Sequence, residues 1–458
     1  FDDWNFFYTV DSEISDKETW QRHFYGIRGD YILKEAFPWS FTYFTKYFLK
    51  IVGYSVENTH YLILTFSILS LFLIYKFCDL ISNNFKLKIL ILILFSTNLF
   101  LIRELNSFRP HSLSIFLSIL SSYFFILIFL QNKTQLKYLS IYIISTFFVL
   151  TIWPQNLAFF AGHCLFLFFI FLKKRTDFLF YSFAPITITS LYILHNFKYI
   201  QYIAIDNSWS YTPIELTFFV NFFFRSFFGS IIFGAFMLLI FSFFLIKEIK
   251  EKLNEIKNKK NLIKIPFFNL NIENFILTNI LTIYSLSITY SLLRESVLAP
   301  KYFIVLIPLI IIWISLKICS KKNLILYNIT ILFVLLNTLY YWNDIPIKRP
   351  PMREALKIIS DNNFKKIYTT EGTVFNNYLS HYNFSIKNNL EISKLSNLKK
   401  NIVQNNFTIL CMNYPRYAVG DHYKDKEHKK CIDITKNENF NISKKIKIDD
   451  FIIYFVNL

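Results

Sequence analysis

Glycine is scarce in this sequence, with 8 residues in 458, and charged residues make up only 17%. Soluble proteins carry about 25% charged residues, so a string of soluble domains is excluded. Five cysteines are too few for a disulfide-stapled scaffold. The chain is instead 54% hydrophobic and contains 55 phenylalanines. This composition excludes disordered and collagen-like chains and indicates a membrane protein.

Long apolar runs recur from residue 59 to residue 342, and each must lie in lipid. A window of about 19 residues separates ten candidate transmembrane spans: 59–78, 86–102, 111–130, 138–153, 155–172, 177–195, 217–246, 274–293, 302–318 and 323–342. The predicted fold class is an all-α polytopic membrane bundle. We expect a further transmembrane helix before Phe1, which gives about eleven spans.

The net charge of +18 would suggest nucleic-acid binding in a soluble protein, but the basic residues alternate between loops. One set of loops carries eighteen of them: Lys76, Lys86, Lys88, Lys133, Lys137, Lys173, Lys174, Arg175, seven lysines from Lys247 to Lys264, Lys317, Lys321 and Lys322. The alternate set carries five: Arg103, Arg109, Lys198, Arg294 and Lys301. The positive-inside rule makes the first set cytoplasmic. The charge is therefore a topology signal, and no nucleic-acid partner is predicted.

This topology places both ends of the chain on the non-cytoplasmic side. Residues 1–58 are predicted to form an external loop with interfacial helices, because Phe41–Val52 combines helical periodicity with aromatic bulk. Residues 59–342 form the bundle. Residues 343–458 are rich in Asn and Lys, and this change in composition predicts a small external α/β domain.

Within that external domain the pattern predicts a helix and three strands: Arg353–Ser360, Lys366–Thr370, Thr408–Met412 and Phe451–Val456. The domain contains two cysteines, Cys411 and Cys431. An oxidising compartment would allow them to form a disulfide, and the sequence leaves this pairing open.

Polar residues cluster at the predicted external ends of the spans. They lie in four segments: the connection Arg103–His111 (RELNSFRPH), the turn Trp153–Asn156 (WPQN), the loop Asp206–Tyr211 and the segment Arg294–Lys301. Each charge alone could be a solvated loop residue. Five cations and several carboxylates at one face of an apolar bundle favour a functional site.

Arg225 is the strongest single candidate for a functional residue. The run 217–246 would be about 45 Å long as a helix, which exceeds a hydrocarbon core of about 30 Å. Its outer part either lies flat or breaks near Gly229, so Arg225 faces headgroups or a buried cavity. His163 lies in mid-span, and we expect it to be a core histidine whose hydrogen-bonding capacity is satisfied. No zinc, redox or nucleotide motif is present, so no cofactor is predicted, and a divalent cation is left open.

Glycosyl transfer from a lipid-phosphate sugar fits these parts. The leaving group is a stable phosphate, so the reaction needs no general acid. It needs cations that stabilise the phosphate as charge develops and a carboxylate that takes the proton of the acceptor hydroxyl. An acidic external loop, a basic cluster at the membrane edge and aromatic platforms for sugars are all present.

Several motifs, in this order, resemble the GT-C superfamily of membrane glycosyltransferases. They are most similar to the polyprenyl- or dolichyl-phosphate-mannose-dependent α-mannosyltransferases of glycosyltransferase family 22. The motifs are Asp2-Asp3, YGIRGDY (25–31), the Arg103–His111 connection, TIWPQNLAFF (151–160), IDNSWSYTP (205–213), FVNFFFRSFFG (219–229) and PKYFIVLIP (300–308).

The resemblance implies an external active site. Asp2 or Asp3 would be the general base, and the carrier phosphate would contact Lys301 and Arg103 or Arg109. We add Arg225 to the candidate phosphate ligands. Candidate acceptor and sugar ligands complete the set: His111, Asp206, Trp209 and Tyr211.

The predicted function is transfer of a sugar, expected to be mannose, from a polyprenyl-phosphate carrier to an external glycan, lipid or protein acceptor. The enzyme would lie in the inner membrane of a bacterium or the endoplasmic reticulum of a eukaryote. One alternative is a lipid or oligosaccharide transporter or flippase, which the few glycines disfavour. Another is a non-catalytic subunit of a glycan-assembly complex.

Overall fold

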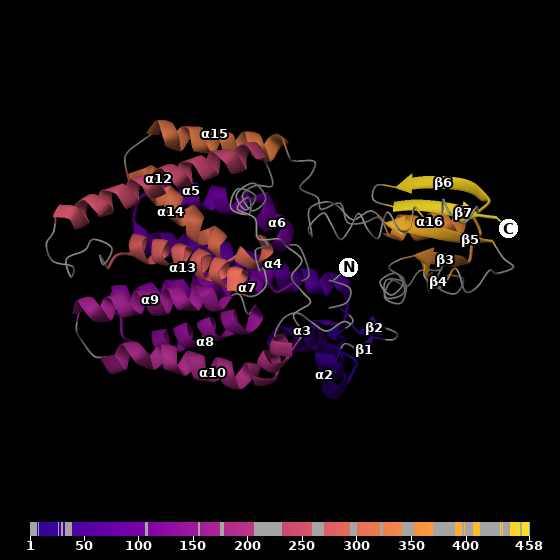
Figure 1. Cartoon of the computed structure of the whole chain (residues 1–458), viewed down its shortest axis with the longest axis horizontal. Helices are drawn as coiled ribbons and strands as arrows, with labels where there is room; N and C mark the ends of the chain where they lie inside the picture. The colour runs from indigo at the N-terminus through magenta and orange to yellow at the C-terminus, as the bar shows by residue number, and fades with distance from the viewer. Residues whose placement is uncertain are drawn as a thin grey trace. The chain divides into compact units, whose positions relative to one another are not determined.

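The fold is described by a computed structural model (Figure 1). The structure describes these residues: 7, 9–25, 27–28, 31–32, 39–105, 109–153, 156–174, 178–205, 231–258, 270–293, 300–320, 324–340, 352–369, 390–395, 398, 406–412, 431, 433, 440–448 and 451–457. They form two units. The helical unit comprises Val10–Gly26 and Leu33–Ile345, and the sheet unit comprises Pro346–Leu458 with Phe1–Thr9 and Ile27–Ile32.

The described part of the helical unit is built of helices throughout. These are α2 (Asp16–Tyr25), α3 (Trp39–Val52), α4 (Val56–Ile81), α5 (Phe85–Ser96), α6 (Leu99–Leu105), α7 (His111–Phe125), the π-helix η1 (Ile126–Leu130), α8 (Leu136–Ile152), α9 (Leu157–Lys174), α10 (Phe178–Ile205), α12 (Ile231–Asn258), α13 (Ile272–Leu293), the 3₁₀-helix η5 (Pro300–Phe303), α14 (Leu306–Ser320) and α15 (Leu324–Tyr340).

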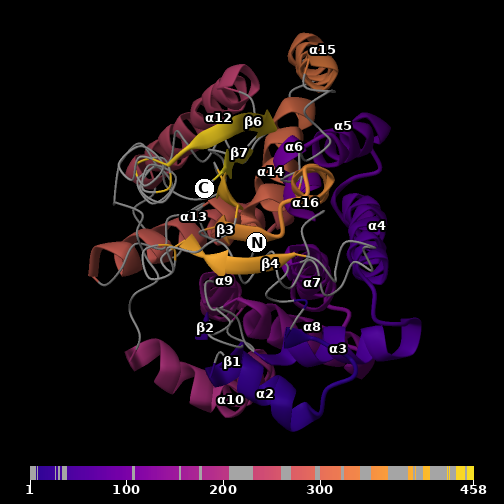
Figure 2. The same ribbon diagram turned by 90° about the vertical axis from the view of Figure 1, so that its right-hand side faces the viewer.

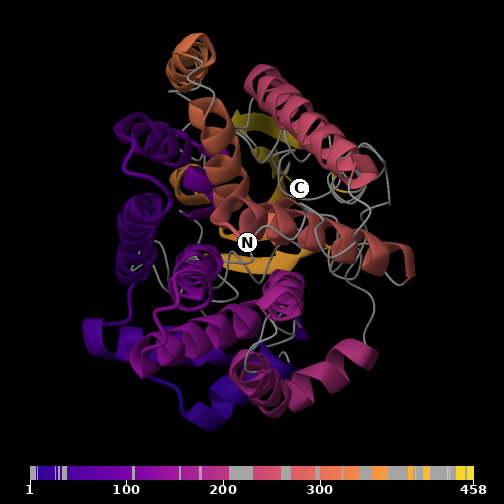
Figure 3. The ribbon, with the colours of Figure 1, turned by 90° about the vertical axis from the view of Figure 1, so that its left-hand side faces the viewer.

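Among the described residues, four helices are long and apolar enough to cross a membrane: Glu57–Ile81, His111–Leu130, Ile232–Glu251 and Ile272–Leu293. Four shorter apolar helices accompany them: Leu136–Ile152, Leu157–Lys173, Leu306–Cys319 and Leu324–Tyr340. α15 lies at the edge of the helical unit (Figure 2 and Figure 3), and leucines such as Leu339, 70% exposed, cover its surface. An apolar surface of this kind is suited to lipid.

Two predicted spans differ from the observed helices. The span 86–102 is broken into α5 and α6, because the Thr97 hydroxyl donates to the Ile93 carbonyl at 2.6 Å while the Asn98 side chain accepts from the Leu101 N–H at 3.0 Å. Such local side-chain bonds compete with the helix ladder. The predicted span 217–246 lies outside the described residues up to position 230, and the rest of it belongs to α12, which continues beyond the span to Asn258.

α7 occupies the interior, between α4 and α8 (Figure 2). Five of its serines are buried: Ser112, Ser114, Ser118, Ser121 and Ser122. Small side chains allow helices to approach closely, and the Ser121 and Thr146 hydroxyls lie 2.6 Å apart across α7 and α8. Serine thus does here what glycine does in other membrane bundles. The prediction for His163 is confirmed in part. Its ring is fully buried and its Nδ1 lies 3.2 Å from the Tyr142 hydroxyl, but its Nε2 has no hydrogen-bond partner among the described residues.

The sheet unit contains one mixed five-stranded sheet in the order β4-β3-β5-β7-β6 (Figure 1). Its elements are α16 (Met352–Asp361), β3 (Lys366–Thr369), β4 (Glu391–Lys394), β5 (Phe407–Met412), β6 (Ile442–Ile448) and β7 (Phe451–Val456), and a separate hairpin pairs β1 (Ile27–Arg28) with β2 (Tyr31–Ile32). β3 pairs in parallel with β4 and β5, whereas β7 runs antiparallel to β5 and β6. The predicted helix and all three predicted strands are confirmed. β4 and β6 were not predicted.

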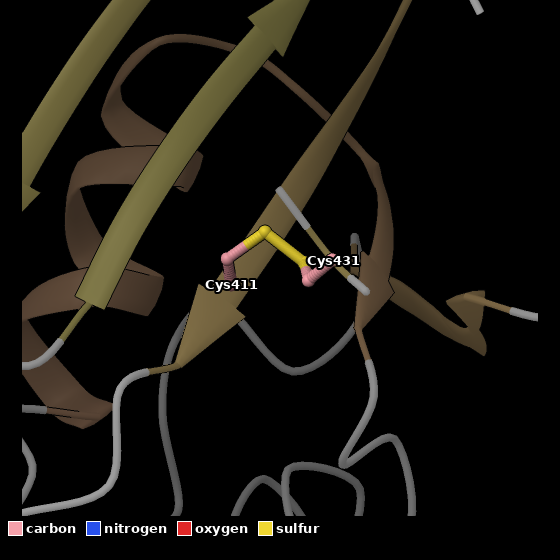
Figure 4. Close-up of a disulfide and its surroundings, with 2 residues drawn as sticks. All are labelled: Cys411 and Cys431. Atoms are coloured by element: carbon pink, nitrogen blue, oxygen red, sulfur yellow. A yellow bond between two sulfur atoms is a disulfide. The ribbon is translucent and has the colours of Figure 1, made fainter. Parts of the chain in front are cut away.

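Both faces of this sheet are apolar. On one face, Leu356 and Ile359 of α16 pack against Phe455 of β7. The other face buries Ile409 and Tyr454 around a disulfide between Cys411 and Cys431 (Figure 4), whose Cα atoms lie 5.7 Å apart. The pairing that the sequence left open is therefore formed.

Candidate functional site

Three segments that lie far apart in the sequence meet at one end of the helical unit. α7 begins at His111, Trp153 follows the end of α8, and Tyr302 lies in η5. The His111 ring stacks on the Trp153 indole, with centroids 5.7 Å apart and planes at 15°. Trp153 also contacts the Tyr302 ring, at 5.7 Å and 65°. We call His111, Trp153 and Tyr302 the aromatic ladder.

The position of Trp153 follows from the local sequence. Trp153 precedes Pro154, and a residue before proline is disfavoured in a helix, so α8 ends and Trp153 is extended, at φ −139° and ψ 129°. The buried Asn156 then donates from Nδ2 to the Ser114 hydroxyl at 3.2 Å and to the Val149 carbonyl at 2.8 Å. The first hydrogen bond connects Asn156 to α7 and the second connects it to α8, so the positions of His111 and Trp153 are fixed relative to each other.

Arg109 supplies a cation beside the ladder. Although its side chain is only half-buried, the surrounding protein lowers the pKa of the guanidinium to about 10 by desolvation, and the nearby Tyr302 phenol opposes this shift. The group therefore stays charged at neutral pH. It lies two residues before the amino end of α7, which carries a partial positive charge. A cation beside a helix amino end favours an anion such as a phosphate.

α3 is fastened to the same end of the helical unit. The Ser40 hydroxyl donates to the Thr151 carbonyl at 3.3 Å, two residues before Trp153. The Trp39 indole stacks on the His195 ring in α10, with centroids 4.4 Å apart and planes at 11°, and it donates to the His195 carbonyl at 3.3 Å. α3 therefore fixes the positions of α8 and α10 at this end.

α3 leaves part of its apolar surface exposed. Phe44 is 45% exposed and Ile51 is 85% exposed, whereas the buried residues are both polar and apolar: Phe41, Thr42, Thr45, Lys46 and Leu49. Exposed apolar side chains on an amphipathic helix are typical of helices that lie in a membrane interface.

Lys46 of α3 forms hydrogen bonds with α2 and with Ile14, which lies shortly before α2. Its ammonium donates to the Ile14 carbonyl at 2.8 Å, the Asp16 carboxylate at 2.7 Å and the Thr19 hydroxyl at 2.9 Å. The Tyr47 hydroxyl donates to the other Asp16 oxygen at 2.6 Å. The hydrogen bond from Lys46 lowers the pKa of the Asp16 carboxyl most, and the hydrogen bond from Tyr47 lowers it further. We call Lys46, Asp16 and Thr19 the lysine clamp.

Of the predicted site residues, the structure describes the side chains of Arg109 and His111, which lie two residues apart in the chain. Arg103 lies in α6 and Lys301 in η5, where the backbone alone is described. The other predicted residues lie outside the described residues: Asp2, Asp3, Asp206, Trp209, Tyr211 and Arg225.

Sequence reasoning missed two members of the site, Trp153 and Tyr302. It singled out their segments, WPQN and PKYF, but assigned no role to the aromatic side chains. The available signal was position, because each aromatic residue directly adjoins a proline or a lysine at the predicted external end of a span. Within the described residues, no three His, Cys, Asp or Glu side chains are close enough to hold a metal ion.

Comparison with known proteins adds no relative. No family model matches this chain, and no curated protein matches it either.

Proposed function

We propose that this chain is an integral membrane glycosyltransferase of the GT-C type. It transfers a sugar, expected to be mannose, from a polyprenyl-phosphate carrier to an external glycan, lipid or protein acceptor. The observation that carries the proposal is the meeting of Arg109 and His111, Trp153 and Tyr302 at one end of the bundle. These residues come from three of the motifs that resemble the family.

The chemistry assigned to this end is stabilisation of a phosphate leaving group. A half-buried guanidinium interacts more strongly with an anion than an exposed one does, because less water screens it. Arg109 would bind the carrier phosphate, with Lys301, Arg103 and Arg225 as further ligands. Asp2 or Asp3 would take the proton of the acceptor hydroxyl. No metal or organic cofactor enters this scheme.

The proposed topology has ten to eleven spans with the ladder on the non-cytoplasmic side. Two observations support it. The basic loops alternate with nearly neutral ones, and the Cys411–Cys431 disulfide in the sheet unit is suited to an oxidising compartment. The protein would thus lie in the inner membrane of a bacterium or the endoplasmic reticulum of a eukaryote.

The direct test is product analysis. Purified protein in lipid nanodiscs is incubated with polyprenyl-phosphate mannose and candidate acceptors, and products are identified by mass spectrometry. Arg109→Ala should slow transfer about ten- to hundredfold, because a hydrogen bond to a charged group contributes about 1.5–3 kcal/mol. Lys137→Ala, an exposed cation at the start of α8, should have no effect. Equal rates in the two variants would refute the phosphate assignment.

The general base is tested separately. Asparagine keeps the shape of aspartate but cannot accept a proton, so Asp2→Asn or Asp3→Asn should lose about a hundredfold or more in rate. Binding of the donor should be unchanged in both variants. Full activity in the double variant would place the base elsewhere, and Asp206 would be the next residue to substitute.

One observation favours the transport alternative. The break between α5 and α6 leaves Asn98 fully buried inside an apolar helix pair, and discontinuous helices commonly form substrate sites in transporters. A transporter would move labelled polyprenyl-phosphate mannose across sealed proteoliposomes without forming a new glycosidic bond. An enzyme would form the bond in detergent, where no second compartment exists.

A further inference from the structure

Tyr302 is the member of the ladder that a ligand can reach. His111 is fully buried and Trp153 is 4% exposed, whereas Tyr302 is only half-buried. The contact between Trp153 and Tyr302 is edge-to-face, at 65°, so Trp153 covers at most one face of the Tyr302 ring. The two inner rings therefore act as a fixed support for an aromatic ring at the surface of the site.

Tyr302 and Arg109 are neighbours although they come from different parts of the chain. The Tyr302 ring contacts Trp153, which stacks on His111, and Arg109 lies two residues before His111 in the chain. The Tyr302 phenol also acts electrostatically on the Arg109 guanidinium. A phosphate bound by Arg109 would have its ester substituent close to the Tyr302 ring. A lipid chain continues into the apolar bundle, so a second substituent is the group that Tyr302 would contact.

We propose that Tyr302 binds the sugar ring of a phosphate-linked sugar, so that this site selects a glycosylated lipid phosphate over the bare lipid phosphate. The proposal rests on the proposed function and adds a residue that determines specificity. An aromatic ring offers a flat apolar surface to the C–H face of a hexose, and aromatic rings commonly line small-molecule sites. Because the ladder already fixes Tyr302, little ordering is needed when the ligand binds.

The test measures affinity rather than turnover. Wild-type full-length protein and its variants in nanodiscs are titrated with two probes, a short-chain prenyl phosphate and the same compound esterified with mannose. Tyr302→Ala should lose about tenfold in affinity for the mannosylated probe, equivalent to about 1.4 kcal/mol, and should bind the bare phosphate as wild type does. Tyr302→Phe should keep the wild-type preference, because it keeps the ring.

Matched variants separate this inference from the proposed function. Tyr290→Ala removes another tyrosine, 47% exposed on α13, and should leave both affinities unchanged. Arg109→Ala should weaken both probes equally. The ratio of the two affinities is measured within each variant, so a partly unfolded sample does not alter it, and Tyr302→Leu repeats the test with more bulk retained.

The possible outcomes are distinct. Loss of the preference in Tyr302→Ala and Tyr302→Leu alone supports the proposal. If the preference survives in both, or if both probes weaken equally, Tyr302 does not contact the sugar and the inference is overturned, while the phosphate site stands. If Arg109→Ala changes neither affinity, the phosphate site itself is refuted, and with it the proposed function.

Discussion

Replacing Lys46 with methionine should loosen α2 from α3. The ammonium makes the three hydrogen bonds of the lysine clamp, to the Ile14 carbonyl, Asp16 and Thr19, and the Lys46 side chain is only 3% exposed. Methionine keeps similar length and bulk but donates no hydrogen bond. The half-buried Ile14 carbonyl then loses a donor, at about 1–3 kcal/mol for an unsatisfied buried group. The buried Thr19 hydroxyl loses one accepted hydrogen bond, at about 0.5–1.5 kcal/mol, and keeps its bond to the Ser15 carbonyl at 3.2 Å.

Two effects reduce this sum. Asp16 is 56% exposed, so water replaces the lost ion pair and its contribution is small. The cost of burying an ammonium also disappears in the variant. The expected net loss is about 2–3 kcal/mol in the local opening free energy of α2 and α3.

Amide hydrogen exchange measured by mass spectrometry reports this quantity directly. The peptide that covers α2 and α3 should exchange about 30- to 140-fold faster, at a factor of ten per 1.4 kcal/mol. Lys50→Met is the matched control, because Lys50 lies one turn further along α3 and is exposed. Equal protection in Lys46→Met and Lys50→Met would refute the argument.

The same clamp predicts a pH dependence. Hydrogen bonds from Lys46 and Tyr47 lower the pKa of Asp16 in the folded chain below its ordinary value of 3.8. The stabilisation is therefore fully present above pH 3.8 and is lost as the pH falls through the lowered value. Protection of α2 should fall over that range in the wild type, and Asp16→Asn should remove this dependence.

Three further predictions concern other parts of the chain. Gly162→Ala places a Cβ 2.5 Å from the Asn279 Oδ1 atom and 3.1 Å from its Cα, so overpacking should destabilise the bundle by about 1–3 kcal/mol; a lower thermal unfolding temperature checks this, and adding Asn279→Ala should restore part of the loss. Cys411→Ser opens a disulfide loop of 20 residues and should lower the free energy of unfolding of the sheet unit by about 3 kcal/mol. The measurement is the protease resistance of the sheet unit, and dithiothreitol should lower the resistance of the wild type to the level of the variant. Cysteines introduced at Asn132 and Asn388 should be labelled from opposite sides of the membrane, and labelling of both from one side would contradict the topology.

The sequence by itself determined the elements whose signal is local. Apolar runs predict helices because a backbone in lipid must satisfy its own hydrogen bonds, and α4, α7 and α13 follow that rule. β7 was predicted at its observed ends, Phe451–Val456, because a short apolar run rich in β-branched and aromatic residues indicates a buried strand. β6 escaped detection because it is an exposed edge strand whose lysines hide the pattern.

The gathering of Arg109 and the aromatic ladder was decided by the tertiary structure. Sequence order placed these residues at the ends of different spans, and a charge count placed those ends on one side of the membrane. Neither source says which helices are neighbours. That choice depends on packing: serines on α7 allow α8 to approach, Asn156 bonds the α8–α9 turn to α7, and η5 brings Tyr302 against Trp153. Contacts between residues distant in the chain have no periodic signature in the sequence. They depend on how side chains of particular shapes pack together, which only the tertiary structure shows.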